Sequence, residues 1–256
     1  MRALDVLASA DHIVAEDTRQ SRKLLQAYDI QAALTPYHDH NAAKRAPNLV
    51  KLVEDGASVA LISDAGTPLV SDPGYKLARA AIDAGLDVFA IPGASAVLTG
   101  LVSSGLASDA FYFGGFLPPK TTARRKAIRA LKTTHASMIF FESAGRLNAT
   151  ISDLYEELGD RDIAIARELT KKYEEIKRAP LSVLIEELSD IKLRGEIVVI
   201  VGPPAASEKW DDQTIDQALK DRIADIGVKR ASEEVAELSG HAKRDIYQRA
   251  LQIKNA

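Results

Sequence analysis

One segment, at residues 63–74, combines the residue types that a cofactor-binding turn needs. It contains two glycines, two prolines and two aspartates, and it directly follows an apolar run. Such a density of glycine and proline demands special backbone geometry. Carboxylates at the carboxyl end of a strand can accept hydrogen bonds from ribose hydroxyls or from an amino group of a nucleoside-like cofactor. The alternative is a long structural loop capped by aspartate, and the segment alone does not decide between the two.

A second turn of this kind, Ile-Pro-Gly-Ala-Ser-Ala, occupies residues 91–96 and also lies between an apolar run and a helical stretch. Small residues let the backbone approach a ligand closely, and free N–H groups at a helix start can hydrogen-bond it. For this segment in isolation, a plain strand-to-helix turn is the commoner explanation. Two such turns after successive strands favour a shared cleft.

The elements that position these turns are predicted by alternating apolar and amphipathic segments. Strands apolar on both faces, and therefore covered on both sides, are predicted at residues 59–62, 88–91, 138–141, 163–166 and 197–201. Helices are predicted at residues 75–84, 96–102, 124–131 and 182–188. Gly85 can end the first of these helices as a left-handed cap. The alternation indicates an α/β fold with a substantially parallel sheet, in which ligands bind at the carboxyl ends of strands.

Several classes of site and location are disfavoured by what the sequence lacks. It has no cysteine, which excludes disulfides, thiolate chemistry, iron–sulfur clusters and cysteine zinc sites, and which suits a reducing cytosol. Neither the G-x-G-x-x-G nor the P-loop pattern occurs. His38 and His40 flank Asp39, but a surface turn explains this trio better than a metal, so we predict no metal site. No stretch approaches the roughly 18 apolar residues of a membrane span, and no signal peptide is evident, so we expect a cytoplasmic protein without membrane contact.

Local charge indicates a polyanion partner. Residues 110–141 contain no acidic residue, although the whole chain carries a net charge of −3. Basic residues in this window could hold phosphates, and the aromatic residues at its start could stack on splayed bases. The alternative is a solvated helix face beside an aromatic core strand. The basic residues are Lys120, Arg124, Arg125, Lys126, Arg129 and Lys132, and the aromatic residues are Phe111, Tyr112, Phe113 and Phe116.

Two segments resemble domain boundaries: the small, polar residues 103–109 and the Gly-Pro-Pro-rich residues 202–207. We predict three domains, an N-terminal α/β domain at residues 1–108, a second α/β domain at residues 109–203 and a C-terminal helical domain at residues 204–256. The last has breaks near Gly227 and Gly240. Its final helical stretch is basic and carries Lys243, Arg244, Arg249 and Lys254.

Seven segments, in order and spread over nearly the whole chain, together resemble the ribosomal RNA small subunit methyltransferase I family of the tetrapyrrole methylase superfamily. Any one of them is weak evidence, but seven in order are specific. They are residues 15–19 (Ala-Glu-Asp-Thr-Arg), 63–75, 92–96, 113–118 (Phe-Gly-Gly-Phe-Leu-Pro), 140–143 (Phe-Phe-Glu-Ser), 166–171 (Ala-Arg-Glu-Leu-Thr-Lys) and 195–198 (Gly-Glu-Ile-Val).

The resemblance implies two α/β domains that hold S-adenosylmethionine between them, with a small helical domain that helps to hold RNA. It implies 2'-O-methylation of a cytidine in the decoding region of 16S rRNA, free or within the small ribosomal subunit, by a homodimer. Carried over by position, the cofactor cleft comprises Asp64, Ala65, Gly66, Thr67, Pro68, Pro92, Gly93, Ala94, Ser95, Ala96, Phe141, Thr170 and Glu196.

Catalytic and RNA-binding candidates follow from the same segments. A ribose hydroxyl is a weak acid, so a general base would help, and Glu142 and Glu168 each follow an apolar strand at a sheet edge. The alternative is that both glutamates only anchor backbone or cofactor. The predicted RNA contacts are Lys120, Arg124, Arg125, Lys126, Arg129, Arg167, Lys171, Lys243 and Arg244.

The sequence departs from the family pattern at two places. Family members usually begin with a strand and a Pro-Thr-Pro-Ile-Gly-Asn-like turn, whereas this sequence starts at residues that match the interior of the following helix. A missing central strand would leave ladder hydrogen bonds open and a core face bare. In addition, residues 144–145 are Ala-Gly where the family more often has Pro-His or Thr-His.

Three other functions share part of this pattern. A methyltransferase of small tetrapyrroles of the precorrin type would use the same cofactor cleft but needs no polyanion surface. A non-catalytic RNA-binding or ribosome-assembly factor would need no cofactor. A generic α/β sugar- or nucleotide-binding protein accounts for the two turns but not for the full set of segments.

Overall fold

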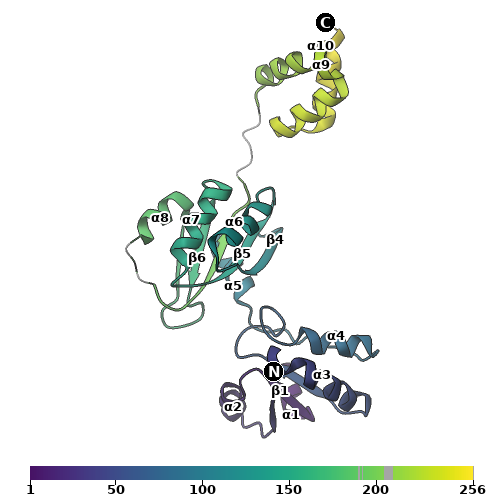
Figure 1. The fold of residues 1–256 in the computed structure, drawn as a ribbon, viewed down its shortest axis with the longest axis vertical. Coiled ribbons are helices and arrows are strands. Elements are labelled where there is room, and N and C mark those ends of the chain that lie inside the picture. Colours follow the sequence, from purple (N-terminus) through teal and green to yellow (C-terminus); the bar gives the residue numbers. More distant parts are fainter. Residues whose placement is uncertain (190, 192, 205–209, 256) are drawn as a thin grey trace.

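The computed structural model describes residues 1–189, 191, 193–204 and 210–255. Figure 1 shows the chain in three parts in sequence order: an α/β part that carries the N-terminus, a second α/β part built on a larger sheet, and a group of C-terminal helices. In this described portion of the chain the strands form two sheets, ordered β2-β1-β3 and β4-β5-β8-β6-β7.

The first part is a small parallel sheet covered by helices on both faces. Its central strand β1 pairs in parallel with both β2 and β3. Ile13 of β1 packs with Leu7 and Leu25 on one face, whereas Val14 packs with Leu49 on the other. This double coverage is why the strands are apolar on successive residues. The elements are α1 (Arg2–Ser9), β1 (His12–Ala15), α2 (Thr18–Ala27), β2 (Leu34–Pro36), α3 (Asp39–Glu54), β3 (Val59–Ile62) and α4 (Tyr75–Asp83).

The second part is a mixed sheet. Strand β4 runs parallel to β5, and the β5-β8, β8-β6 and β6-β7 pairs are antiparallel. The register pairs Ser143 with Glu196 and Arg167 with Ile197, so β5 and β6 end, and β8 begins, at one edge of the sheet. The elements are α5 (Ala96–Ser104), β4 (Phe111–Phe116), α6 (Thr121–Ala130), β5 (Ser137–Ser143), α7 (Leu147–Leu158), β6 (Asp162–Arg167), β7 (Glu175–Pro180), α8 (Leu181–Leu188) and β8 (Glu196–Val201).

Both faces of this sheet are buried. Phe140 and Val199 point to the face that is covered by α6, α7 and α8. Their neighbours Ile139 and Ile200 point to the other face, where they pack with Leu101 of α5. Helix α5 follows the residue 91–96 turn, so that turn is held directly against the second sheet.

The C-terminal part consists of α9 (Asp212–Ser239) and α10 (Lys243–Asn255). Gly227 interrupts α9 with φ 75° and ψ 161°, and Gly240 ends it in the left-handed conformation. Both predicted breaks are therefore confirmed. The helical stretches share a core that includes Ile215, Leu219 and Ile246. Within the residues that the structure describes, no helix is both long enough and apolar enough to cross a membrane.

The predicted strands at residues 59–62, 138–141, 163–166 and 197–201 and the four predicted helices are confirmed within a few residues. The predicted strand at residues 88–91 is wrong. Strand β3 pairs with β1 alone, so residues 88–91 have no ladder neighbour in the sheet, and a strand requires one. Val88 and Phe89 are exposed, so the apolar run is not covered as expected.

The expectation of a substantially parallel sheet holds for the first sheet and is wrong for most of the second. An apolar run shows that both faces of a strand are covered, but not the direction of its neighbours. Only residues 168–174 separate β6 from β7, which is too short for a parallel crossover and leaves an antiparallel pair. Of the predicted linker at residues 202–207, residues 202–204 have no regular structure and residues 205–207 lie outside the described residues.

Candidate functional site

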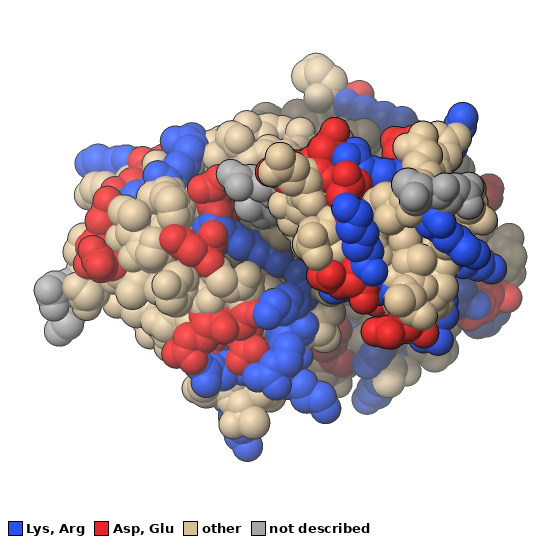
Figure 2. All heavy atoms as spheres, turned by 90° about the horizontal axis from the view of Figure 1, so that it is seen from above, with Lys and Arg blue, Asp and Glu red and all other residues tan. Residues whose placement is uncertain are grey.

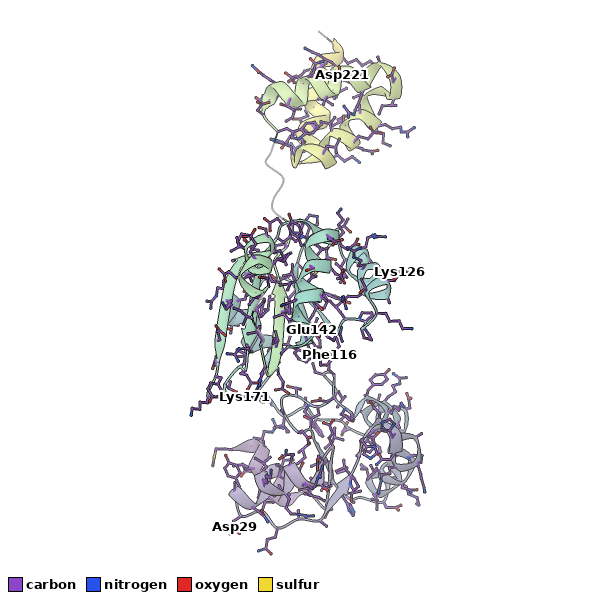
Figure 3. The ribbon with its side chains drawn as sticks, turned by 60° about the vertical axis from the view of Figure 1, so that its left-hand side comes forward. Asp29, Phe116, Lys126, Glu142, Lys171 and Asp221 are labelled. Atoms are coloured by element: carbon purple, nitrogen blue, oxygen red, sulfur yellow. The ribbon has the colours of Figure 1, made fainter. Side chains whose placement is uncertain are left out.

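A cleft of about 340 Å³ lies between the loops of the first part and the edge of the second sheet where β5 and β6 end. Figure 3 shows Phe116, Glu142 and Lys171 at this edge, on the side of the second sheet that faces the first part. The lining residues are Ala65, Gly66, Thr67, Val70, Ser71, Asp72, Ser95, Ala96, Val97, Phe116, Phe141, Glu142, Ser143, Ala166, Leu169, Lys171, Gly195, Glu196, Ile197 and Val198.

The first wall consists of the residue 63–74 loop and the start of α5. The Thr67 hydroxyl donates to the Ala94 carbonyl at 3.0 Å, which ties the loop to the residue 91–96 turn. The Asp64 carboxylate accepts from the backbone N–H of Asp17 at 3.1 Å and so joins the loop to the end of β1. Ser95 caps α5 by accepting from the backbone N–H of Leu98. The two turns predicted from sequence therefore form one surface.

Burial gives this wall an acidic group with perturbed ionisation. Asp72 lines the cleft and is half-buried. Its burial raises the pKa of its carboxyl group, the Ser63 hydroxyl opposes this, and the Asp64 carboxylate adds to the rise. A carboxyl group with a raised pKa in a cleft is a feature of functional sites.

Glu142, at the end of β5, anchors the second wall. The residue is 3% exposed, its Oε1 accepts from the Ser143 backbone N–H at 2.7 Å, and its Oε2 accepts from the Thr150 hydroxyl at 2.7 Å. The Nε of Arg146 lies 3.3 Å from Oε1, and the Nη2 of Arg146 donates to the Leu117 carbonyl at 2.7 Å. Glu142 thus has both oxygens engaged, and through Arg146 it supports the segment that follows β4.

A lysine bridges two carboxylates across the ends of β6 and β8. The Nζ of Lys171 lies 2.9 Å from the Glu168 Oε1 and 2.6 Å from the Glu196 Oε2. The backbone N–H of Glu196 also donates to Glu168 at 3.0 Å. This N–H, and then Lys171, lower the pKa of Glu168, and the bonds to Glu196 and Glu168 raise the pKa of Lys171. The three side chains form one charged rim of the cleft.

Backbone strain is concentrated in one loop of each wall. Leu69 and Ser71 in the first wall have φ of 71° and 64°, and Glu168 and Thr170 in the second have φ of 50° and 65°. Among the described residues only Asp29 is a further non-glycine residue with positive φ. Each such conformation costs on the order of 1–3 kcal/mol, persists only where the surrounding structure fixes it, and is found most often at active sites and ligand clamps.

Comparison with known proteins identifies the fold. A family model described as Tetrapyrrole (Corrin/Porphyrin) Methylases matches residues 1–185. The chain belongs to the tetrapyrrole methylase family. A second model, described as the RsmI C-terminal HTH domain, matches residues 209–254.

Curated relatives in the tetrapyrrole methylase family are similar over nearly the whole chain. A protein of Mesorhizobium japonicum named ribosomal RNA small subunit methyltransferase I is 47% identical over 100% of this chain and 87% of its own length. A protein of the same name from Escherichia coli O157:H7 is 40% identical over 98% of this chain and 89% of its own. The chain therefore belongs to this branch of the tetrapyrrole methylases.

Among solved structures, the uroporphyrin-III C-methyl transferase of Thermus thermophilus complexed with S-adenyl homocysteine superposes with a TM-score of 0.52. It is 17% identical, over 78% of this chain and 89% of that chain. At this identity the match shows the fold alone, which is the predicted tetrapyrrole methylase fold.

The structure brings together only part of the predicted cofactor set of this tetrapyrrole methylase. Ala65, Gly66, Thr67, Ser95, Ala96, Phe141 and Glu196 line the cleft. Six others are not among the lining residues: Asp64, Pro68, Pro92, Gly93, Ala94 and Thr170. Of the two candidate bases, Glu142 lines the cleft and Glu168 does not. Cofactor binding by these residues stays a prediction.

Sequence reasoning missed several lining residues of the tetrapyrrole methylase cleft. Asp72 lies inside the segment singled out, and Leu169 and Gly195 lie inside matched segments, so their positions carried a signal. Phe116 was noted as an aromatic residue but not as part of the cleft. Lys171, which the sequence predicted as an RNA contact, lines the cleft, and its contact with RNA stays a prediction.

All three arginines of the acid-free window are paired with acidic residues of α7. Arg124 is 3% exposed, and its Nε donates to Asp153 at 2.6 Å. Arg125 pairs with Asp153 and Glu156, and Arg129 donates to Glu157 at 2.7 Å. Figure 2 shows that, on the face seen from above, Lys and Arg side chains lie among Asp and Glu side chains.

Unlike its arginines, the lysines of the acid-free window have no ion-pair partner among the described residues. Lys120, Lys126 and Lys132 are exposed, and none has a side-chain ion pair with the described part of the chain. Arg167 pairs with Glu175 at 3.1 Å. Among the RNA contacts predicted in the second part, Lys120 and Lys126 are therefore the side chains without an ion pair to the described residues.

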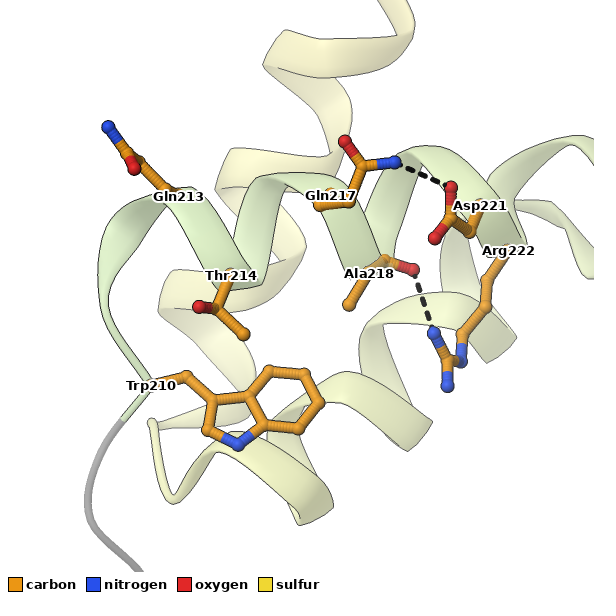
Figure 4. Close-up of a pocket in the computed structure, with 7 residues that line it drawn as sticks. All are labelled: Trp210, Gln213, Thr214, Gln217, Ala218, Asp221 and Arg222. Carbon is orange, nitrogen blue, oxygen red and sulfur yellow. Dashed lines mark hydrogen bonds between the residues drawn. The ribbon is translucent and has the colours of Figure 1, made fainter.

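The C-terminal helices of the tetrapyrrole methylase chain carry a shallow hollow beside Trp210 (Figure 4). Its polar groups are satisfied locally, because Gln217 donates to Asp221 at 2.8 Å and Arg222 donates to the Ala218 carbonyl at 3.1 Å. Lys243 pairs with Glu233 at 2.7 Å, whereas Arg244 is exposed and has no ion pair within the described residues. Within the same residues no cluster of acidic or histidine side chains could hold a metal.

Proposed function

We propose that this chain is an S-adenosylmethionine-dependent methyltransferase of small-subunit ribosomal RNA, and that its acceptor is the ribose 2'-oxygen of a cytidine in the decoding region of 16S rRNA. The observation that carries the proposal is the cleft between the two α/β parts, in a chain 47% identical to a relative named for rRNA methylation. The family's cofactor use is supported by the S-adenyl homocysteine complex of a structural neighbour.

The cleft residues fit such a cofactor. Phe141 offers aromatic surface for a purine, and Gly66 leaves the loop backbone open, because nothing lies within 4 Å of where its Cβ would be. Asp72 and Glu196 offer carboxylates to the amino and sulfonium charges. The volume of about 340 Å³ lies within the range of small-molecule sites.

When bound, S-adenosylmethionine supplies a methyl group on a cationic sulfur. The chain's own contribution is to hold the acceptor oxygen in line with that group, and orientation of this kind supplies up to about 7–11 kcal/mol. A general base adds about 10²–10⁴-fold, and Glu142 is the better candidate of the two because it lines the cleft. Its engaged oxygens favour the competing role, in which Glu142 only holds Arg146 and the backbone.

Three further parts of the proposal concern organisation. We retain three domains, predicted at residues 1–108, 109–203 and 204–256, the homodimer, and the C-terminal helices as an RNA-binding unit. Helix α5, within the first of these ranges, packs against the second sheet. The match of residues 209–254 to a helix-turn-helix model supports the last of these. Arg167 and Lys171 are kept as contacts to a neighbouring phosphate, which would have to share them with their present carboxylate partners.

The first experiment separates the functions that share this cleft. Calorimetry with S-adenosylmethionine is followed by transfer of a radioactive methyl group to small ribosomal subunits, to free 16S rRNA, or to a tetrapyrrole. Nucleoside mass spectrometry of the RNA identifies a 2'-O-methylcytidine. Cofactor binding with methylation of RNA supports the proposal. Methylation of the tetrapyrrole alone would favour a precorrin-type enzyme, and RNA binding without cofactor binding would favour a non-catalytic assembly factor.

A further inference from the structure

A register shift in β4 places two phenylalanine side chains in different environments. The ladder between β4 and β5 shifts register between Phe113 and Phe116. Gly114 makes this possible, because a Cβ there would lie 2.5 Å from the ring of Phe140, and Gly115 has a φ of 60°. Bulges of this kind redirect a side chain next to an active site.

As a result, Phe113 points inward and Phe116 points into the cleft. Phe113 is partly buried, and its ring centroid lies 4.9 Å from that of Phe141. Phe116 also contacts Phe141, edge to face with centroids 5.6 Å apart, but it is 60% exposed although it lines a concave site. Most of its ring is therefore available to a planar ligand.

The backbone is held in place on both sides of Phe116, at Leu117 and at Gly115. The next residue, Leu117, is 4% exposed, and its carbonyl accepts from Arg146 at 2.7 Å. On the other side, the backbone of Gly115 approaches the first wall, since a Cβ there would lie 3.4 Å from the Ser71 hydroxyl. Phe116 thus stands where the two walls meet (Figure 3).

We propose that Phe116 is the residue that takes the base of the acceptor nucleoside, by stacking on it after the nucleotide has turned out of the RNA. This inference rests on the function proposed above, and it assigns the recognition of the acceptor to one side chain. Enzymes that act on a base extrude its nucleotide, and proteins that recognise single-stranded RNA stack splayed bases on aromatic side chains. A splayed acceptor nucleotide would bring its ribose into the cleft and leave its base for such a ring.

Two observations favour the acceptor over the cofactor as the partner of Phe116. Its exposure places it at the mouth of the cleft, whereas the half-buried Phe141 lies behind it. Lys120 follows four residues later, is exposed and has no ion pair within the described residues, so it can contact the phosphate beside a stacked base.

The test compares Phe116→Ala with Phe116→Trp and with Phe111→Ala. Phe111 is a matched control, because it lies on the same strand and is 45% exposed but does not line the cleft. Steady-state methylation of unmodified small ribosomal subunits gives KM for the subunit and kcat, and calorimetry gives the affinity for S-adenosylmethionine. Thermal unfolding verifies that each variant is folded.

Phe116→Ala should raise KM for the subunit on the order of 10- to 100-fold, the loss expected for one stacked base. Phe116→Trp should restore KM, Phe111→Ala should leave it unchanged, and cofactor affinity should stay within twofold in all three. Weaker cofactor binding with an unchanged KM would assign Phe116 to the cofactor and overturn the inference. An unchanged KM and affinity would overturn it while the function stands. Wild-type protein that binds the cofactor without methylating RNA would refute the function and this inference with it.

Discussion

Glu142 and Arg146 form an ion pair across the turn between β5 and α7, with 3.3 Å between Oε1 and Nε. The glutamate lines the cleft, while the arginine holds the Leu117 carbonyl on the far side of the turn. The Glu142 carboxylate can therefore act as a general base in the cleft or only position Arg146 and the backbone. These two roles predict different effects on methylation when the carboxylate is replaced by a neutral group.

Replacing Glu142 with Gln keeps the shape and lets the amide hydrogen-bond Thr150, but it removes the negative charge and the basic oxygen. If Glu142 is the general base, single-turnover methylation should fall by about 10²–10⁴-fold while affinity for S-adenosylmethionine is unchanged. Normal single-turnover methylation by the variant would remove the base role and leave Glu142 as a positioning residue. Ser143→Ala is a suitable control, since it lines the cleft without a basic group.

Arg124 and Lys126, neighbours in the acid-free window, should behave in opposite ways. Arg124→Met breaks a buried pair and should lower the free energy of unfolding by about 3 kcal/mol, at the lower end of such losses because Arg125 still pairs with Asp153. Exposed Lys126→Glu should change that free energy by less than about 0.5 kcal/mol.

The same pair should separate stability from RNA affinity. Lys126→Glu should weaken RNA binding and reduce the slope of log affinity against log salt by about one. Urea unfolding and filter binding at several salt concentrations measure both quantities. Weakened RNA binding by a fully stable Arg124→Met variant would contradict the structural role assigned to this arginine.

Sequence patterns predicted the elements whose signal is local. The apolar run at residues 197–201 forms β8, and Gly240 ends α9. Both were predictable because burial on both faces and a left-handed cap each require particular residue types at those positions. The direction of neighbouring strands has no such local signal in the sequence, which is why the antiparallel pairs of the second sheet were not predicted. Strand β7 is half-exposed and charged at Lys177 and Arg178, so its period did not distinguish it from a loop.

The parts of the candidate site that depend on residue types within one loop were predictable from the sequence. The parts that depend on contacts between segments distant in the sequence were not. The residue 63–74 loop was found from its own glycines and aspartates. Phe116 and Gly195 were not assigned to the cleft, because their places in it depend on a bulge and on an antiparallel register. Arg124 was predicted to contact RNA because its acidic partner, Asp153, lies 29 residues later and beyond the window.

The charged rim should contribute stability only within a limited pH window. The pKa of Glu168 is lowered, so its contribution is present above its ordinary value of 4.5 and is lost as the pH falls through the lowered pKa. The pKa of Lys171 is raised, so its contribution is present below 10.5 and is lost as the pH rises through the raised pKa. Wild type should therefore exceed Glu168→Gln in stability between about pH 5 and pH 10, with a difference that shrinks toward acid.

Urea unfolding of both proteins at a series of pH values measures this difference. Lys171→Met should lose its deficit at the alkaline end instead, which makes the two variants controls for each other. A deficit of Glu168→Gln that stays constant down to pH 3 would show that the bond to the Glu196 N–H, rather than the charge, carries the effect.

Gly195 should be the most sensitive small residue of the cleft. A Cβ at this position would overlap the Glu168 carboxylate, and its φ of 95° is one that side chains rarely adopt. Gly195→Ala should displace Glu168, release Lys171 and weaken S-adenosylmethionine binding at least tenfold, because both Gly195 and Lys171 line the cleft. Gly56→Ala is the matched control, since Gly56 has a similar φ of 97°, does not line the cleft, and has nothing within 4 Å of a Cβ there. Calorimetry on the two variants decides the matter: equal affinities would mean that the rim is not coupled to the cofactor, whereas a loss confined to Gly195→Ala would place Glu168 among the residues that shape its site.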